Sequence, residues 1–178
     1  MANAILDGTD CVMLSGESAM GQYPVEAVAM LARIAESIEP HRPGGWVQDQ
    51  LRNRGAGEVS VTDAIALSVE TTVARLGPAA VIVPTRGGAT ARNVTRFRLP
   101  VWIVAVCAHE ATCRQLELSY GVYPMLEPDP PDDWRAFAGR FLAEHRLPGR
   151  LAVVTAGPSA RNPEANHRIE IVELETGS

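Results

Sequence analysis

The chain has 178 residues, 46% of them hydrophobic and 21% charged, as in an ordinary globular domain. A formal net charge of −5 without a basic tract argues against a nucleic-acid-binding protein, and no apolar run is long enough to span a membrane. All 16 Lys+Arg positions are arginine, which excludes a Walker lysine and Schiff-base chemistry in this chain.

The first predicted elements are a short strand and a helix. The apolar run at residues 11–14 is typical of a strand buried on both faces, and a polar turn follows at residues 15–18. Pro24 suits the first turn of a helix that runs to Ile38 and is stopped by Pro40. One face of this helix is expected to be buried: Val25, Val28, Ala29, Leu31, Ala32, Ala35 and Ile38.

A connector follows this helix. Residues 41–57 are rich in Gly, Pro and polar residues and are predicted to be a linker, with a short helix around residues 47–53. The sequence thus divides into a first segment at 1–40, the linker at 41–57 and a compact domain at 58–178.

Helices and strands then alternate regularly. A helix at 61–76 ends at Gly77-Pro78. Strands are predicted at 79–84, 101–106, 122–126 and 150–155, helices at 88–97, 109–119 and 131–145, and an edge strand at 168–172. Strands separated by helices form parallel sheets, so we expect an α/β fold: a three-layer α/β/α domain with a mostly parallel five-stranded sheet.

The best candidate ligand site is the turn after the first strand of this domain. It lies at the carboxyl end of a strand and before a helix, where free N–H groups and the helix dipole favour an anion. The candidate phosphate-binding residues are Thr85, Arg86, Gly87, Gly88, Thr90 and Arg92. The alternative is a plain capped turn between a strand and a helix.

A second loop, residues 157–166, follows the next-to-last strand. Arg161 is a further candidate for phosphate binding, whereas Glu164 would repel a phosphate. The alternative is an ordinary polar loop. The four histidines have no zinc-ligand spacing, so no metal site is predicted. The three cysteines are odd in number and are expected to be reduced core residues.

Several segments resemble one family. Residues 14–24 read Leu-Ser-Gly-Glu-Ser-Ala-Met-Gly-Gln-Tyr-Pro, similar to the Leu-Ser-Gly-Glu-Thr-Ala-Lys-Gly-x-Tyr-Pro typical of pyruvate kinases. Ala-Arg-Asn-Val-Thr-Arg-Phe-Arg at 91–98, Gly-Val-Tyr-Pro at 121–124 and Val-Val-Thr-Ala-Gly at 153–157 also resemble family segments in the same order. The resemblance implies that residues 1–40 are a strand-helix remnant of a TIM barrel, its eighth strand and helix. Residues 58–178 would be the carboxy-terminal domain.

The resemblance also bears on the candidate sites. It makes Ser15 and Glu17 relics of an active site, with Met20 where the family has a lysine near the nucleotide phosphates. A thioether cannot neutralise a phosphate, so no catalytic residue is assigned; the alternative is that Ser15 and Glu17 only orient a turn. In regulated pyruvate kinases the loop matching residues 85–90 grips a phosphate of a sugar bisphosphate, and Arg86 would replace some of the charge of a lost loop arginine.

We therefore expect the carboxy-terminal region of a pyruvate kinase, which converts phosphoenolpyruvate and ADP to pyruvate and ATP. This region would be inactive alone and would serve assembly or effector binding, with a sugar phosphate or nucleotide as ligand. Magnesium and potassium are implied only for a complete enzyme. Because a strand at 11–14 has no barrel to close, a homo-oligomer is expected. Without a signal peptide, the expected location is the cytoplasm. The alternative is a free-standing phosphometabolite-binding regulatory or protein-interaction module.

Overall fold

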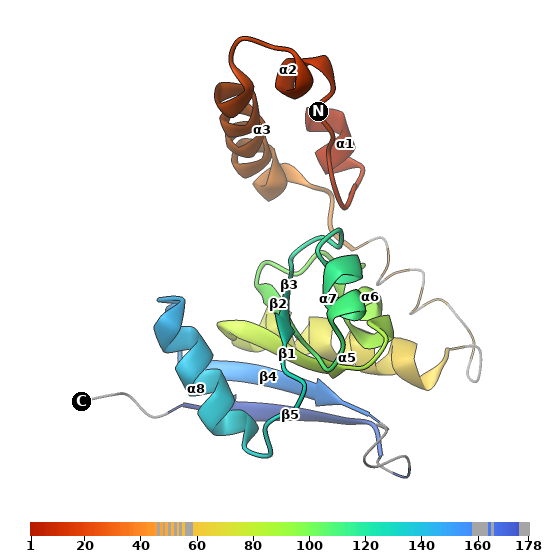
Figure 1. Ribbon diagram of the computed structural model, residues 1–178. Helices are drawn as coiled ribbons and strands as arrows, with labels where there is room; N and C mark the ends of the chain where they lie inside the picture. The colour runs from red at the N-terminus through yellow and green to blue at the C-terminus, as the bar shows by residue number, and fades with distance from the viewer. Residues whose placement is uncertain are drawn as a thin grey trace. The chain divides into compact units, whose positions relative to one another are not determined.

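A computed structural model of the chain describes residues 1–45, 47, 49, 51, 53, 55, 59–157, 164 and 166–174. The chain divides into two compact units, Met1–Trp46 and Val47–Ser178 (Figure 1). We call the first the N-terminal unit and the second the α/β domain.

The N-terminal unit is made of short helices around one longer helix. Its elements are α1 (Ala2–Leu6), α2 (Gly16–Ala19), α3 (Pro24–Ile38) and the 3-10 turn η1 (Glu39–His41). The helix predicted to begin at Pro24 is confirmed. Proline suits the first helical position because the N–H group that it lacks would have no hydrogen-bond partner within the helix. Helix α1 was not predicted, and its Ile5 is the one buried hydrophobic residue among residues 1–45.

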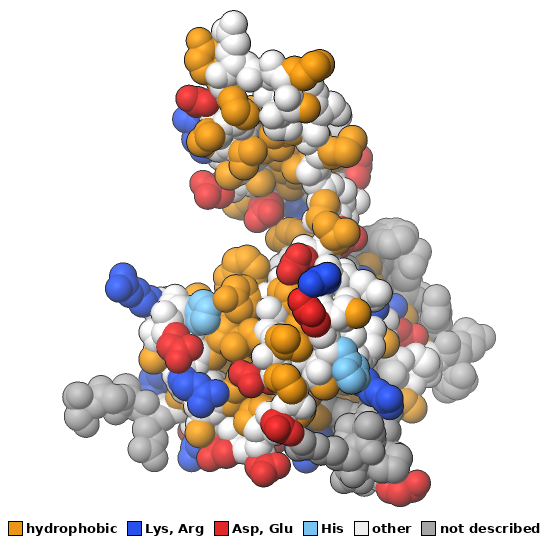
Figure 2. All heavy atoms as spheres, viewed as in Figure 1, with side chains coloured by type: hydrophobic (Ala, Val, Ile, Leu, Met, Phe, Trp, Pro, Cys, Tyr) orange, Lys and Arg blue, Asp and Glu red, His pale blue; other side chains and the backbone are white. Residues whose placement is uncertain are grey.

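The predicted strand at residues 11–14 is wrong. The four residues lie in no helix or strand, and Met13 is 86% exposed. The predicted buried stripe of α3 is also wrong, since no residue of α3 is buried and Val25 is 76% exposed. Figure 2 shows hydrophobic side chains on the surface of this unit. A strand needs neighbouring strands, and residues 1–45 contain none that could pair with 11–14 or cover α3.

The α/β domain is built on a five-stranded sheet. Its strands are β1 (Ala80–Thr85), β2 (Trp102–Cys107), β3 (Val122–Leu126), β4 (Leu151–Ala156) and β5 (Arg168–Glu173), in the order β3-β2-β1-β4-β5. The pairs β1–β2, β1–β4 and β2–β3 are parallel, and β5 is an antiparallel edge strand. The predicted mostly parallel sheet with a closing edge strand is confirmed.

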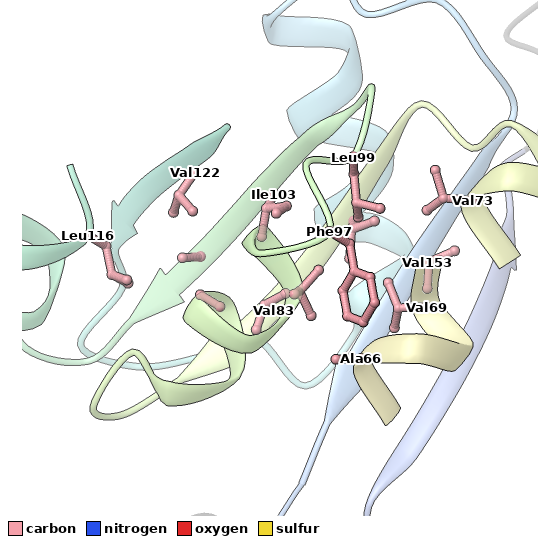
Figure 3. Close-up of a cluster of buried hydrophobic side chains, with 14 of the residues drawn as sticks. Ala66, Val69, Val73, Val83, Phe97, Leu99, Ile103, Leu116, Val122 and Val153 are labelled. Carbon is pink, nitrogen blue, oxygen red and sulfur yellow. The ribbon is translucent and has the colours of Figure 1, made fainter. Parts of the chain in front are cut away.

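Helices cover both faces of this sheet. Helices α5 (Val61–Leu76), α6 (Ala89–Thr95) and α7 (Glu110–Leu116) pack on one face, and α8 (Trp134–Glu144) packs on the other. In Figure 3, Val69 and Val73 of α5, Leu116 of α7 and Val83 of β1 point into the first buried cluster. The second cluster joins Phe137 and Phe141 of α8 to the opposite face of the strands. These layers confirm the three-layer α/β/α prediction.

Helix α5 has well-defined ends. The Ser60 hydroxyl accepts a hydrogen bond from the Asp63 N–H at 3.1 Å, and Gly77 ends the helix in the left-handed conformation. The Asp63 carboxylate forms an ion pair with Arg96, the residue that follows α6. Hydrogen bonds from Ser60 and then from Arg96 lower the pKa of Asp63. The ion pair therefore ties α5 to the end of α6.

Much of the predicted linker lies outside the described residues. The predicted helix around residues 47–53 has every second residue outside the described part of the chain, so this helix stays a prediction. Leu51, which is described, is buried and belongs to the cluster beneath α5, α6 and α7. At least this linker residue is therefore part of the packed α/β domain.

The cysteines differ from one another in exposure. Cys107 and Cys113 are buried, as predicted for core cysteines, but Cys11 is exposed, which corrects its prediction. Burial, and then the hydrogen bond with Cys113, raises the pKa of the Cys107 thiol to about 12. The exposure of Cys11 has the same cause as that of Met13: the segment that contains both is not in a sheet.

Candidate functional site

The Ser-Gly-Glu turn is held by its own side chains. The Ser15 N–H donates to the Glu17 carboxylate at 3.1 Å, and the Ser18 hydroxyl donates to the Ser15 carbonyl at 3.3 Å. Hydrogen bonds from the backbone N–H groups of Glu17 and Ser15 lower the pKa of Glu17. Both predicted relic residues thus have a role in shaping the turn. Their descent from a catalytic site stays a prediction.

Gly21 belongs to the same motif and has a steric reason to be glycine. A Cβ atom at this position would lie 2.3 Å from the carbonyl oxygen of Glu17. The chain therefore passes too close to the turn for any side chain. Met20, beside it, is 89% exposed.

An apolar groove lies beside this turn in the N-terminal unit. Its volume is about 520 Å³, and it is lined by Met1, Val12, Met13, Leu14, Ser18, Val28, Leu31, Ala32 and Ala35. The walls are thus the segment at 11–14 and one face of α3. The lining residues at 12–14 and on α3 were predicted to lie in a buried strand and a buried helix stripe, so the open surface that they form was not predicted.

The ligand loop, residues 85–90, connects β1 to α6 in a tight turn. The Gly88 N–H donates to the Thr85 hydroxyl at 3.0 Å, and Gly88 has a φ of 81°. A Cβ atom at Gly88 would lie 2.9 Å from Arg92 Nη1 and 3.1 Å from Leu116 Cδ2. Gly88 therefore meets both a conformational and a steric requirement for glycine. Gly87 has nothing within 4 Å of a Cβ position.

Arg92 braces the ligand loop. Its guanidinium donates to the Gly87 carbonyl at 3.0 Å and to the Gln115 side-chain carbonyl at 3.2 Å. The hydroxyl of Thr112, one turn earlier on α7, donates to the Arg86 carbonyl at 2.8 Å. Neither Thr112 nor Gln115 was found from the sequence, because both contacts join segments more than twenty residues apart.

The structure brings most of the predicted site residues together. Thr85, Arg86, Gly87, Gly88 and Thr90 are within the ligand loop, and Arg92 lies two residues after it in α6. Arg86 is exposed, whereas Thr90 is half-buried. Arg161 lies outside the described residues. Glu164, the predicted source of repulsion, is described and exposed.

The ligand loop lies at a reversal in strand order. From β1 the chain crosses to β2 on one side, while β4 lies on the other side of β1. Open parallel sheets bind ligands at such a point, beyond the carboxyl ends of the strands. Near the carboxyl end of β4, the hydroxyl of fully buried Thr155 has no hydrogen-bond partner among the described residues.

The described parts of the chain contain neither a metal-ligand cluster nor a helix able to span a membrane. No group of three or more His, Cys, Asp or Glu side chains there is close enough together to hold a metal ion. No helix there has the length and apolar character needed to cross a bilayer.

Comparison with known proteins gives the same family over both units. Residues 63–172 match the family described as pyruvate kinase, alpha/beta domain, and residues 1–28 match pyruvate kinase, barrel domain. Pyruvate kinase 2 of Synechocystis is 42% identical over 163 residues, covering 88% of this chain and 26% of that protein. The pyruvate kinase of Geobacillus stearothermophilus is 41% identical over 170 residues, covering 88% and 27%.

A solved structure agrees with these matches. Cryptosporidium parvum pyruvate kinase in complex with ADP is similar over 98% of this chain and 36% of its own, with a TM-score of 0.84 and 27% identity. The chain spans about a quarter of the length of the curated relatives named above. The chain belongs to the pyruvate kinase family, with the end of the barrel domain at residues 1–28 followed by the carboxy-terminal alpha/beta domain.

Proposed function

We propose that this chain serves assembly and effector binding in a cytoplasmic pyruvate kinase and does not transfer a phosphoryl group by itself. The observation that carries the proposal is the contrast between the two units. The α/β domain has two buried clusters on either side of its sheet, whereas the N-terminal unit buries only Ile5 among residues 1–45. One unit is complete in itself, and the other has an uncovered apolar surface.

Two observations support the lack of independent catalysis. Phosphoryl transfer depends on metal ions and positioned cationic groups around the moving phosphate. Met20, at the place of the family's lysine, is an exposed thioether, and the chain has no lysine elsewhere. Ser15 and Glu17 are engaged with each other through the backbone of their own turn. Magnesium and potassium are proposed only for the complete enzyme.

A coupled pyruvate kinase assay tests this directly. The purified chain is mixed with phosphoenolpyruvate, ADP, magnesium and potassium, and pyruvate formation is followed beside full-length Geobacillus stearothermophilus pyruvate kinase. We expect turnover by the full-length enzyme and none by the chain. Turnover by the chain at a rate proportional to its concentration would refute the proposal.

Effector binding is proposed for the ligand loop, with a sugar phosphate or a nucleotide as ligand. Support comes from the exposed guanidinium of Arg86 at the carboxyl end of β1, from the two glycines of the loop and from its bracing by α7. A phosphate there would accept hydrogen bonds from Arg86 and from the loop backbone. Arg92 is assigned the role of holding the loop rather than contacting the phosphate.

Calorimetry with a hexose bisphosphate, a hexose monophosphate and a nucleotide tests this role. We expect one of them to bind, and Arg86→Ala to weaken that binding about tenfold or more, as loss of a charge-assisted hydrogen bond does. Arg75→Ala is the control. This exposed arginine lies in the last turn of α5, which leads into the amino end of β1, whereas Arg86 follows the carboxyl end of that strand. Equal affinity of Arg86→Ala and the native chain, or no binding by any ligand, would contradict the assignment.

The alternative is a free-standing phosphometabolite-binding regulatory or protein-interaction module. The closed core of the α/β domain favours it, since this unit has the packing of an independent domain. Such a module would bind the metabolite and also change its oligomeric state in response. Light scattering with and without the ligand separates the two proposals: a ligand-dependent change in mass favours the regulatory module.

A further inference from the structure

We propose that Trp102 and Tyr123 of the α/β domain form an aromatic docking site for the acidic, proline-rich segment 127–133 of a second copy of this chain. The contact is head-to-tail, because the site and the segment lie at opposite ends of the sheet. The inference rests on the proposed assembly role and adds the two surfaces that meet.

Two aromatic side chains are exposed on one face of the sheet. Trp102 begins β2 and is 49% exposed, and Tyr123 of β3 is 39% exposed. Side chains of a strand alternate between its two faces, and Val104 and Met125 pack in the cluster beneath α8. Trp102 and Tyr123, each two residues earlier, therefore point to the face of α8, which leaves them partly open to solvent. Figure 2 shows hydrophobic side chains exposed between α8 and α7.

Contacts within the domain hold these rings in place. Trp102 and Tyr123 meet edge to face, with ring centroids 6.4 Å apart. His145 Nδ1 lies 3.0 Å from the Phe141 carbonyl, which can only accept a hydrogen bond. Nε2 of the neutral imidazole therefore accepts from the Tyr123 hydroxyl, at 3.2 Å. Because the Tyr123 ring is already fixed, it loses little conformational freedom when a partner binds.

The surroundings of the rings favour an acidic partner. Arg146 follows His145 at the end of α8, and Arg150 immediately precedes β4; both are exposed. Arg150 is on the same face of the sheet as the rings, since Ala152, two residues later, packs beneath α8. Glu144 is the one acidic neighbour in the last turn of α8, so the local charge is positive. Aromatic pairs bind proline-rich segments, whose extended conformation forms before binding.

The chain itself contains a segment with these properties. Residues 127–133 read Glu-Pro-Asp-Pro-Pro-Asp-Asp, with four carboxylates, three prolines and no basic residue. The segment connects β3 to α8 and lies in no helix or strand, as expected where prolines favour an extended backbone. Pro128 and Asp132 are exposed. Its charge and its prolines therefore complement the arginines and the aromatic rings of the docking site.

The segment cannot reach the docking site of its own chain. The Glu127 N–H donates to the Cys107 carbonyl at 2.8 Å, and the Asp133 carboxylate caps α8 by accepting from the Ala136 N–H at 2.9 Å. Both ends of the segment are thus anchored, about 13 Å along β3 from Tyr123 at its first end. Each copy offers one docking site and one segment at different places, so the contact is heterologous and builds a ring or an open chain of copies.

Light scattering of the full chain over a concentration series tests the contact. We expect the mass of the native chain to rise with concentration, and Trp102→Ala and Asp132→Arg each to weaken association at least about tenfold. Leu76→Ala is the control, because Leu76 is similarly exposed but lies on α5, on the opposite face of the sheet. Mixed in equal amounts, the Trp102→Ala and Asp132→Arg chains should form dimers and nothing larger, since only one intact site and one intact segment remain. Circular dichroism verifies that each variant keeps its helices, and the exposed Asp132 provides the test if Trp102→Ala does not fold.

A synthetic peptide gives a second measurement without mutation of the chain. The peptide with the sequence of residues 127–133 should dissociate the native oligomer, and a peptide with alanine in place of its three prolines should be at least about tenfold less potent. Equal potency of the two peptides would overturn the proposal. So would a native chain that has the mass of one copy at every concentration up to about 1 mM, or two variants that do not combine. An oligomer that persists in both Trp102→Ala and Asp132→Arg would overturn this contact but leave the proposed assembly role standing, and calorimetry at the ligand loop is independent of both.

Discussion

Gly88→Ala is predicted to destabilise the α/β domain, while Gly87→Ala does not. Gly88 has a φ of 81°, and placing a side chain in the left-handed region costs about 1–2 kcal/mol. The new Cβ would also lie 2.9 Å from Arg92 Nη1 and displace this guanidinium from its two hydrogen bonds, each of which contributes about 0.5–1.5 kcal/mol. The unfolded chain offsets about 0.4–1 kcal/mol of this, since alanine has less backbone entropy to lose.

The expected net loss for Gly88→Ala is therefore about 1–5 kcal/mol, because the strain and the lost hydrogen bonds exceed the entropic gain. Gly87 has no atom within 4 Å of its Cβ position and no left-handed φ. At Gly87 only the entropic term remains, so Gly87→Ala is expected to stabilise by about 0.4–1 kcal/mol.

Urea unfolding followed by circular dichroism measures both variants. With a slope of about 2 kcal/mol per molar urea, a loss of 2 kcal/mol lowers the midpoint by about 1 M. The midpoint of Gly87→Ala is expected at or slightly above that of the native chain. Equal midpoints for the two variants would refute the steric role assigned to Gly88 and, with it, the tight geometry of the ligand loop.

Three further predictions concern the described residues. The pKa of Asp63 is lower in the folded chain than in the unfolded chain. The ionised carboxylate therefore contributes fully to stability above the unfolded pKa of about 3.9, and this contribution is lost as the pH falls through the lower pKa of the folded chain. Asp63→Asn should abolish that acid-side loss in urea titrations from pH 6 to 2, and an unchanged slope would contradict it. Thr112→Val removes the hydrogen bond to the Arg86 carbonyl and is expected to cost about 1 kcal/mol in urea unfolding, against no change if that contact is dispensable. A thiol reagent should modify only Cys11 in the native chain and all three cysteines in urea, as counted by mass spectrometry.

The sheet was predictable because its signals are local. Short apolar runs separated by helical patterns located all five strands to within about a residue at each end, including β3 at Val122–Leu126. Helix α5 was predicted at its observed bounds, since Gly77-Pro78 ends it. The layers then followed from the alternation of strands and helices.

The failures involve partners that a local pattern does not contain. Residues 11–14 have the composition of a buried strand, but a strand forms only when neighbouring strands supply its hydrogen bonds. The same holds for the apolar face of α3, none of whose residues is buried. In the ligand loop, the contact of Arg92 with Gln115 joins two helices and could not be found from spacing, while the phosphate-binding role of the loop residues stays a prediction. Sequence patterns thus located the apolar segment, the apolar face of α3 and the ligand loop, but not the groups that contact them.

Residue-resolved amide hydrogen exchange of the isolated chain tests the division into a complete domain and an uncovered barrel segment most directly. Amides in the central strands β1, β2 and β4 should exchange only through global unfolding, because both faces of these strands are buried. Residues 12–14 should exchange near the rate of an unfolded chain, and α3 should be only weakly protected, since none of its residues is buried. Protection of α3 and residues 12–14 equal to that of β1 would contradict the proposal that an uncovered apolar surface of the N-terminal unit serves assembly.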